Sequence, residues 1–401
     1  MNHDEKFSYY KIDKLFWRWK KQDGARIVHE VSLSTDNPPP PLPALPVAKP
    51  KAVPSPPKSP KSDPTVKMIN DLLKVADSVS RFSTWLKTPV PPKPPKAEKI
   101  AAPKKTVPPF DIQEIPQALR KEMMPIGAKL MERWFAGRLN YSAIPSDEIK
   151  EINQEGKPYP PDMYDTTTVK MDWILEFARA RRKYDYLIND AIRSPAALQV
   201  LQKKLRFYRH RSELSTHDIC RDDPQHLHQF FQFQHVEVDG TFAEKIKLQL
   251  MADAVRTGVP DDLTAALGSF VIYAAIAHVR LSRDPFGTQK TTAEVTGAWI
   301  YVKDNFTFTD EPGQRSQYLG HWSSNGVIVM PLDGVAAASR YIPYVESPVT
   351  LGDPVIKGQV YYPIHNSDFR QWAIRHQRGG DFIIYSDRRF VHIFPPIVLY
   401  L

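Results

Sequence analysis

Proline placement is the feature of this sequence that most restricts its fold. Twenty of the 38 prolines fall between residues 36 and 110 of the 401-residue chain. Proline fixes φ and lacks a backbone N–H, so a segment this rich in proline forms an extended, hydrated chain and no packed core. The sequence therefore predicts a disordered proline-rich region between a short N-terminal arm and a globular body.

The basic charge of the chain belongs to the same region. The formal net charge is +9, yet residues 111–401 carry 34 Lys and Arg against 35 Asp and Glu, whereas residues 36–110 carry 13 against five. A protein that binds nucleic acid usually presents a basic patch on its folded surface. This balance predicts no such patch, and we expect no nucleic-acid partner.

One segment inside the proline-rich region has the pattern of an amphipathic helix. Residues 66–87 place apolar side chains three or four positions apart, in a stripe that includes Ile69, Leu72, Leu73, Val79, Phe82 and Leu86. The proline-rich runs on either side cannot cover this stripe, so we expect the helix to bind a groove on a partner protein. The alternatives are packing against the C-terminal body and a disordered segment that only has a helix-like pattern.

Composition and periodicity divide the chain into four parts. We expect an N-terminal arm at residues 1–35, a proline-rich linker at 36–110, a helical subdomain at 111–222 and an antiparallel β-rich domain at 223–401. In the arm, the run IVHEVSL alternates like a short strand. A run of helices followed by a run of strands indicates the α+β class.

Helices and strands can be placed within these parts. Expected helices are residues 115–138 with a break at Pro125, residues 163–190 with a cap among residues 165–168 before the helix itself, and residues 194–208 with Ser194 as the N-cap. Expected strands are residues 230–238, 269–281, 293–302, 326–331, 358–363, 381–386 and 389–394.

The most apolar stretch, residues 263–279, is 17 residues long and contains several polar side chains. A membrane span takes about 20 mostly apolar residues. We therefore expect this stretch in the core, with no stable transmembrane insertion.

The single cysteine and the N-terminal sequence bear on where the chain folds. Cys220 excludes an internal disulfide, and the first 21 residues lack the apolar segment of a secretory signal peptide. Both observations favour folding in a reducing cytoplasm.

Common catalytic motifs are missing from the sequence. It has no phosphate-binding glycine-rich loop, no G-x-S-x-G, no H-E-x-x-H and no C-x-x-C. Cys220 follows His217 by three residues, a spacing that a thiol and its base could share but that structural residues share more often. His226 and His228 could lie on one side of a strand, but no third ligand follows at a useful spacing, so no metal site is expected.

The densest polar group lies near the C-terminus. The candidate catalytic residues are His321, His365, Asp368 and His376. Histidine and aspartate can transfer protons while nearby arginines hold an anion, as in a hydrolase or transferase. The structural alternative is that Asp368 caps a short helix and Arg370 pairs with Asp381.

Several segments in the same order resemble one bacterial family. They are residues 115–137, 165–180, 297–310, 318–327 and 366–387. Over about residues 112–401 the chain resembles a proteobacterial family whose domain has no assigned function and whose members are often encoded beside type VI secretion genes. The resemblance implies no catalytic residues and leaves the cofactor unknown.

The resemblance also implies a role. It implies a type VI secretion cargo effector, an antibacterial toxin that is made in the cytoplasm, secreted by a non-classical route and delivered into target cells. The expected partners are the secretion spike or a dedicated chaperone, bound through residues 66–87, and an immunity protein. The alternatives are a non-enzymatic adaptor of the secretion machine and a membrane-perturbing toxin.

Overall fold

The computed structural model describes residues 6–15, 18–42, 106–140, 150–153, 155–239, 261–283, 291–310, 313, 315–331 and 344–401. The chain divides into two compact units, one made of residues 1–43 and 106–401 and the other of residues 44–105. We call the first the main unit. The helix predicted at residues 66–87, with its partner-binding stripe from Ile69 to Leu86, lies outside the described residues.

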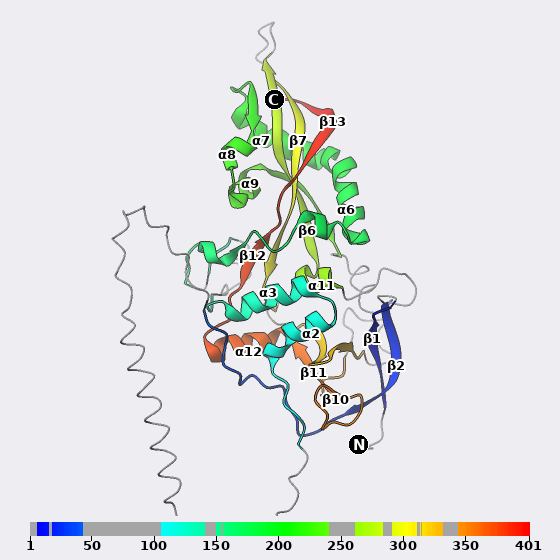
Figure 1. Cartoon of the computed structure of the whole chain (residues 1–401). Coiled ribbons are helices and arrows are strands. Elements are labelled where there is room, and N and C mark those ends of the chain that lie inside the picture. The colour runs from blue at the N-terminus through cyan, green and yellow to red at the C-terminus, as the bar shows by residue number, and fades with distance from the viewer. Residues whose placement is uncertain are drawn as a thin grey trace, which may run out of the picture. The chain divides into compact units, whose positions relative to one another are not determined.

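Six short strands of the main unit close into a barrel (Figure 1). In barrel order they are β1 (Phe7–Asp13), β2 (Arg18–Ile27), β10 (Val349–Thr350), β11 (Val360–His365), β8 (Tyr318–Ser323) and β9 (Gly326–Val329). The pairing of Tyr10 with Val329 closes the ring. Without β1 and β2, strands β9 and β10 would each lose one neighbour. The N-terminal residues are therefore a structural part of the barrel.

The chain leaves the barrel after Ile27. The strand predicted over IVHEVSL is wrong, because Glu30 has a left-handed φ of 60° that ends the extended run. Residues 34–38 then run beside residues 110–113, where Ser34 N–H donates to the Phe110 carbonyl and Ile112 N–H donates to the Ser34 carbonyl, both at 2.9 Å.

A second sheet of seven strands forms the rest of the β structure. Its order is β3 (Tyr164–Asp165), β12 (Phe382–Tyr385), β7 (Thr291–Phe306), β6 (Phe270–Arg283) and β4 (Glu213–Ser215), with β13 (Arg389–Tyr400) also on β7 and β5 (Gln232–Val238) also on β6. Figure 1 shows the long β6 and β7 strands side by side, with β13 along β7. The strands predicted at residues 269–281 and 293–302 are confirmed.

Helices cover this sheet and one side of the barrel. They are α2 (Ile115–Lys121), α3 (Pro125–Ala136), α5 (Met171–Ile174), α6 (Ala178–Asn189), α7 (Pro195–Leu205), α8 (Thr216–Cys220), α9 (Pro224–Phe231), α11 (Asp262–Leu267) and α12 (Asn366–His376). Short 3-10 turns are η1 (Ile112–Glu114), η2 (Pro161–Met163), η3 (Ala191–Arg193) and η4 (Arg206–Tyr208). The α+β class is confirmed, with the helical segment at about residues 112–231.

Local sequence signals explain most helix ends. Pro125 begins α3, and Ser194 caps α7 by accepting a hydrogen bond from Ala197 N–H at 3.3 Å. The helix expected after a cap at residues 165–168 is present as two helices, α5 and α6. The Asp165 carboxylate accepts hydrogen bonds from the backbone N–H groups of residues 167 and 168, which holds a turn there, and helical structure begins only at α5.

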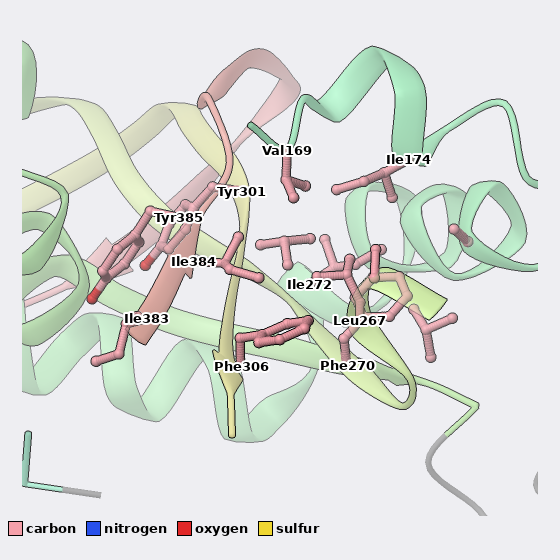
Figure 2. Packing of buried hydrophobic residues seen from close by; sticks show 14 of the residues in the cluster. Val169, Ile174, Leu267, Phe270, Ile272, Tyr301, Phe306, Ile383, Ile384 and Tyr385 are labelled. Carbon is pink, nitrogen blue, oxygen red and sulfur yellow. The ribbon is translucent and has the colours of Figure 1, made fainter. Parts of the chain in front are cut away.

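The two faces of the seven-stranded sheet differ in chemistry. Figure 2 shows Ile272 and Ile384 directed to the side of Val169 and Ile174, in the main hydrophobic core, whereas Tyr301 and Tyr385 lie on the other side of the strands. This follows from the period of two along a strand. A tyrosine-bearing face thus lies opposite the aliphatic one.

The apolar stretch at residues 263–279 is divided between α11 and β6. Strand β6 pairs with β7 on one side and with β4 and β5 on the other, so this stretch is core, as expected. Across the described ranges, none of the helices combines the length and the hydropathy that spanning a membrane requires.

Candidate functional site

Three of the four predicted catalytic residues gather around Tyr318, and the most buried of them is His321. Its Nδ1 lies 2.5 Å from the Tyr318 hydroxyl and its Nε2 lies 3.1 Å from the Ser347 carbonyl oxygen. Burial lowers the pKa of His321 to about 3, so the ring is neutral, with Tyr318 donating to Nδ1 and Nε2–H donating to Ser347. Both ring nitrogens are therefore used inside the fold.

His365 and Asp368 stand at the start of α12. The Asp368 carboxylate accepts a hydrogen bond from His365 N–H at 2.7 Å, as the helix-capping interpretation predicted. The His365 ring lies between two carboxylates, with Nε2 3.3 Å from Glu346 and Nδ1 3.7 Å from Asp368. Asp368 raises the pKa of His365 above its ordinary value, against burial and with help from Glu346. Of the predicted residues in this cluster, these two are partly exposed.

His376 lies at the opposite end of α12 from this cluster. Its ring packs on Trp372 and its Nε2 donates to the Thr35 carbonyl at 2.7 Å, which holds the chain after β2 against α12. Arg370, in the middle of the helix, makes an ion pair with Asp381, as the structural alternative predicted. The structure therefore separates His376 from the other three predicted catalytic residues.

The other histidine and cysteine candidates lie on α8 and α9. Cys220 is buried, and burial raises the pKa of its thiol to about 11. The prediction that His226 and His228 share a strand is wrong, because Asp223 caps a helix there by accepting from His226 N–H at 2.9 Å. Among the residues that the structure describes, no three His, Cys, Asp or Glu side chains are placed to hold a metal ion.

A polar cluster that the sequence analysis did not identify lies between α9 and the tyrosine-bearing face of the sheet. Its centre is the Glu151 carboxylate, which contacts Lys303 Nζ at 2.8 Å, the Tyr164 hydroxyl at 2.7 Å and Gln225 Nε2 at 2.6 Å. Burial is the largest single influence and opposes the charged form, yet the contacts with Lys303, Tyr164 and Gln225 together hold the pKa of Glu151 below its ordinary value. Glu151 and Lys303 therefore form a charged pair. We call these four residues the carboxylate cluster.

Aromatic side chains adjoin the carboxylate cluster. His228 Nδ1 lies 3.0 Å from the Tyr301 hydroxyl, and the His228 ring meets the rings of Tyr273 and Tyr385 edge to face. Burial, together with the charge of Lys303, lowers the pKa of His228 to about 4. Tyr385 is 1% exposed, and its hydroxyl has no hydrogen-bond partner among the described residues.

An open depression of about 580 Å³ lies next to the carboxylate cluster. Its lining shares Tyr164 and Gln225 with that cluster and otherwise comprises Tyr159, Pro161, Thr166, Cys220, Arg221, Asp222, Asp223 and Pro224. Ligand sites are concave surfaces with aromatic walls and a few converging polar groups. The depression and the carboxylate cluster together meet that description.

Sequence reasoning missed the carboxylate cluster because its members come from four separate segments. Tyr301 and Lys303 alternate on β7, and Tyr273 and Tyr385 lie opposite them on neighbouring strands. The only sequence signal was this polar and aromatic alternation in strands whose other face is aliphatic.

Comparison with known proteins places the chain in a family but gives it no function. No curated protein and no solved structure matches the sequence. Residues 110–401 match DUF6402, a family of unknown function, and the chain therefore belongs to that family.

Proposed function

We propose that this protein is a cargo effector of a type VI secretion system and that it carries its docking segment as an insertion. The proposal rests on the family resemblance given above and on one structural observation. The two stretches of chain that flank residues 43–105 lie against each other on the main unit.

Specific contacts hold both stretches. Before the insertion, Arg378 Nη2 donates to the Pro40 carbonyl at 2.6 Å. After the insertion, Gln113 Nε2 donates to the Asn37 carbonyl at 2.7 Å, and the Asp111 carboxylate accepts from the N–H groups of Asp36 and Asn37. These contacts are made between residues that the structure describes on the two sides of the insertion.

This arrangement supports a docking role for the insertion. Strands β1 and β2 join the barrel and residues 106–114 join the main unit, so the described part of the fold is connected on both sides of the insertion. The insertion holds the apolar stripe of residues 66–87 between proline-rich runs. We propose that this stripe binds the secretion spike or a dedicated chaperone in the cytoplasm, and that the main unit is the delivered toxin, which an immunity protein neutralises in the producing cell.

Toxicity in a susceptible bacterium tests the effector role. The main unit, with a glycine- and serine-rich linker in place of residues 44–105, is expressed once in the cytoplasm and once with an export signal. Growth inhibition in one compartment supports a toxin and names the compartment of its target. Normal growth in both compartments contradicts the toxin and favours an adaptor of the secretion machine.

A further inference from the structure

The carboxylate cluster has the chemistry of an oxyanion-binding site. Lys303 on β7, Tyr164 on β3 and Gln225 on α9 direct an ammonium, a hydroxyl and an amide N–H group at one carboxylate, with contacts of 2.6–2.8 Å. Donors that converge from three elements on one acceptor, with one of them charged, are the usual means by which proteins bind carboxylate and phosphate groups.

The carboxylate in this position belongs to a residue with an unfavourable backbone conformation. Glu151 has a φ of 58°, in the left-handed region that a side chain with a Cβ disfavours. Its carbonyl accepts from Tyr159 N–H at 2.9 Å, so a turn supports this conformation. Strained residues of this kind occur at ligand sites more often than elsewhere.

The site offers more donors than Glu151 uses. An ammonium group has three N–H bonds, and Glu151 accepts one of those of Lys303. Tyr385 lies opposite Lys303 in the β7–β12 register, and its buried hydroxyl has no partner among the described residues. A phosphate or carboxylate group from a ligand could accept from both residues.

The depression beside the cluster has room for the rest of such a ligand. Tyr164 and Gln225 belong to both the cluster and the lining, so a ligand group bound at Lys303 would continue past them into the depression. Tyr159 and Pro161 supply apolar contact there. Asp222 and Asp223 outnumber Arg221 in the lining, so the lining disfavours a second negative charge.

We propose that Lys303, Tyr164, Gln225 and Tyr385 bind the single carboxylate or phosphate group of a small molecule, and that Glu151 occupies this position as an internal competitor. The remainder of the ligand is uncharged or cationic and lies in the depression. This inference does not depend on secretion, and failure of the effector proposal leaves it intact.

The test measures binding of inorganic phosphate and of acetate to the full chain by calorimetry at constant ionic strength. Glu151→Ala removes the competitor and is expected to bind one of the two probes at least about tenfold more tightly than the wild type, the gain expected for a freed charge-assisted contact. The probe that binds more tightly identifies the group as phosphate or carboxylate. If Glu151→Ala does not fold, Glu151→Gln keeps the side-chain shape and removes the charge. This variant is also expected to bind the probe more tightly than the wild type does.

Two further variants make the test specific. In the Glu151→Ala background, Lys303→Met and Tyr385→Phe should each weaken probe binding, whereas Tyr273→Phe, on the same face of the sheet, should not. Absence of saturable binding to both Glu151 variants, or binding that Lys303→Met leaves unchanged, would overturn the proposal. Tetramethylammonium binding in place of either anion would also overturn it, in favour of a cation site formed by the tyrosines.

Discussion

The Ser34 hydroxyl donates a 2.7 Å hydrogen bond to Oδ2 of Asp111, which lies 77 positions later in the chain. The same carboxylate oxygen accepts from the backbone N–H groups of Asp36 and Asn37 at 3.0 and 3.1 Å, and Oδ1 accepts from Gln113 N–H at 3.0 Å. One buried side chain therefore joins the stretch before residues 43–105 to the stretch after them.

Removing this carboxylate should destabilise the main unit. Asp111→Ala leaves several partly buried donors without an acceptor, and we expect the free energy of unfolding to fall by about 2–4 kcal/mol. Asp36→Ala is the matched control, because its ion pair with Arg375 is exposed and should contribute less than about 0.5 kcal/mol. Urea unfolding of both variants measures the difference. Equal stability of the two variants would show that Asp111 is not the junction we describe.

The internal deletion and the N-terminal truncation should behave differently. We expect a chain with a glycine- and serine-rich linker of about 20 residues in place of residues 44–105 to unfold cooperatively, because both flanks remain attached. A chain of residues 111–401 lacks β1 and β2 and exposes two barrel edges, so it should be poorly soluble. Circular dichroism and gel filtration of both chains test this. A well-folded truncation would contradict the role of the N-terminal strands.

Stability should fall in mild acid because His321 is buried and neutral. The folded pKa of about 3 lies below the ordinary value of 6.5, so the unfolded chain binds a proton first as the pH falls. Stability from this group is full above pH 6.5 and is lost between about pH 6.5 and 3, and at pH 5 the loss is about 2 kcal/mol. His365 has the opposite effect, because its pKa is higher in the folded chain than its ordinary value. The stability that charged His365 contributes is present at low pH and is lost as the pH rises through this folded pKa.

His321→Asn isolates the acid effect. Asparagine can still accept from the Tyr318 hydroxyl through Oδ1, in the position of Nδ1, and it does not titrate. We expect the unfolding free energy of the variant to differ less between pH 7.5 and pH 5.0 than that of the wild type. His217→Asn is the exposed control. The same pH dependence in wild type and His321→Asn would rule out His321 as the source.

Alanine substitutions test whether the four residues predicted from the sequence are catalytic. If the cluster around Tyr318 is catalytic, toxicity of the main unit should fall about 100-fold or more with His365→Ala and with Asp368→Ala. Stability should change little with His365→Ala, whereas Asp368→Ala should also cost about 1 kcal/mol because it removes the hydrogen bond from His365 N–H at the start of α12. His321→Ala should lower stability because its side chain is fully buried, and His376→Ala should act only through the contact with Thr35. Toxicity that survives all four changes, in variants shown to be folded, would remove this cluster from the catalytic role.

Local sequence patterns predicted helices and strands more reliably than they predicted which segments lie next to each other in the fold. Alternation placed β6 and β7, and the proline at position 125 placed the start of α3, because these signals act within one turn or one strand. The sequence placed a cap at residues 165–168, where the Asp165 side chain accepts from nearby backbone N–H groups, but periodicity did not register the break between α5 and α6.

The candidate sites were harder to predict from the sequence than the helices and strands, because their residues are brought together by the tertiary structure. His365 and Asp368 were adjacent in the sequence and stay adjacent through helix capping. Glu151, Tyr164 and Lys303 come together only because β3, β12 and β7 lie side by side in the sheet, a pairing that no local pattern specifies. The hydrogen bond between Ser34 and Asp111 could not be predicted for the same reason.

Export of the internal deletion shows whether residues 44–105 are the docking segment. In a producing strain with an active type VI system, the full chain and the chain lacking residues 44–105 are expressed at equal levels and quantified in the culture supernatant. We expect the full chain to be exported only when the contractile sheath is present, and the deletion variant to stay in the cells although it is folded. Export of the deletion variant at the level of the full chain, or export of the full chain without the sheath, would contradict this expectation.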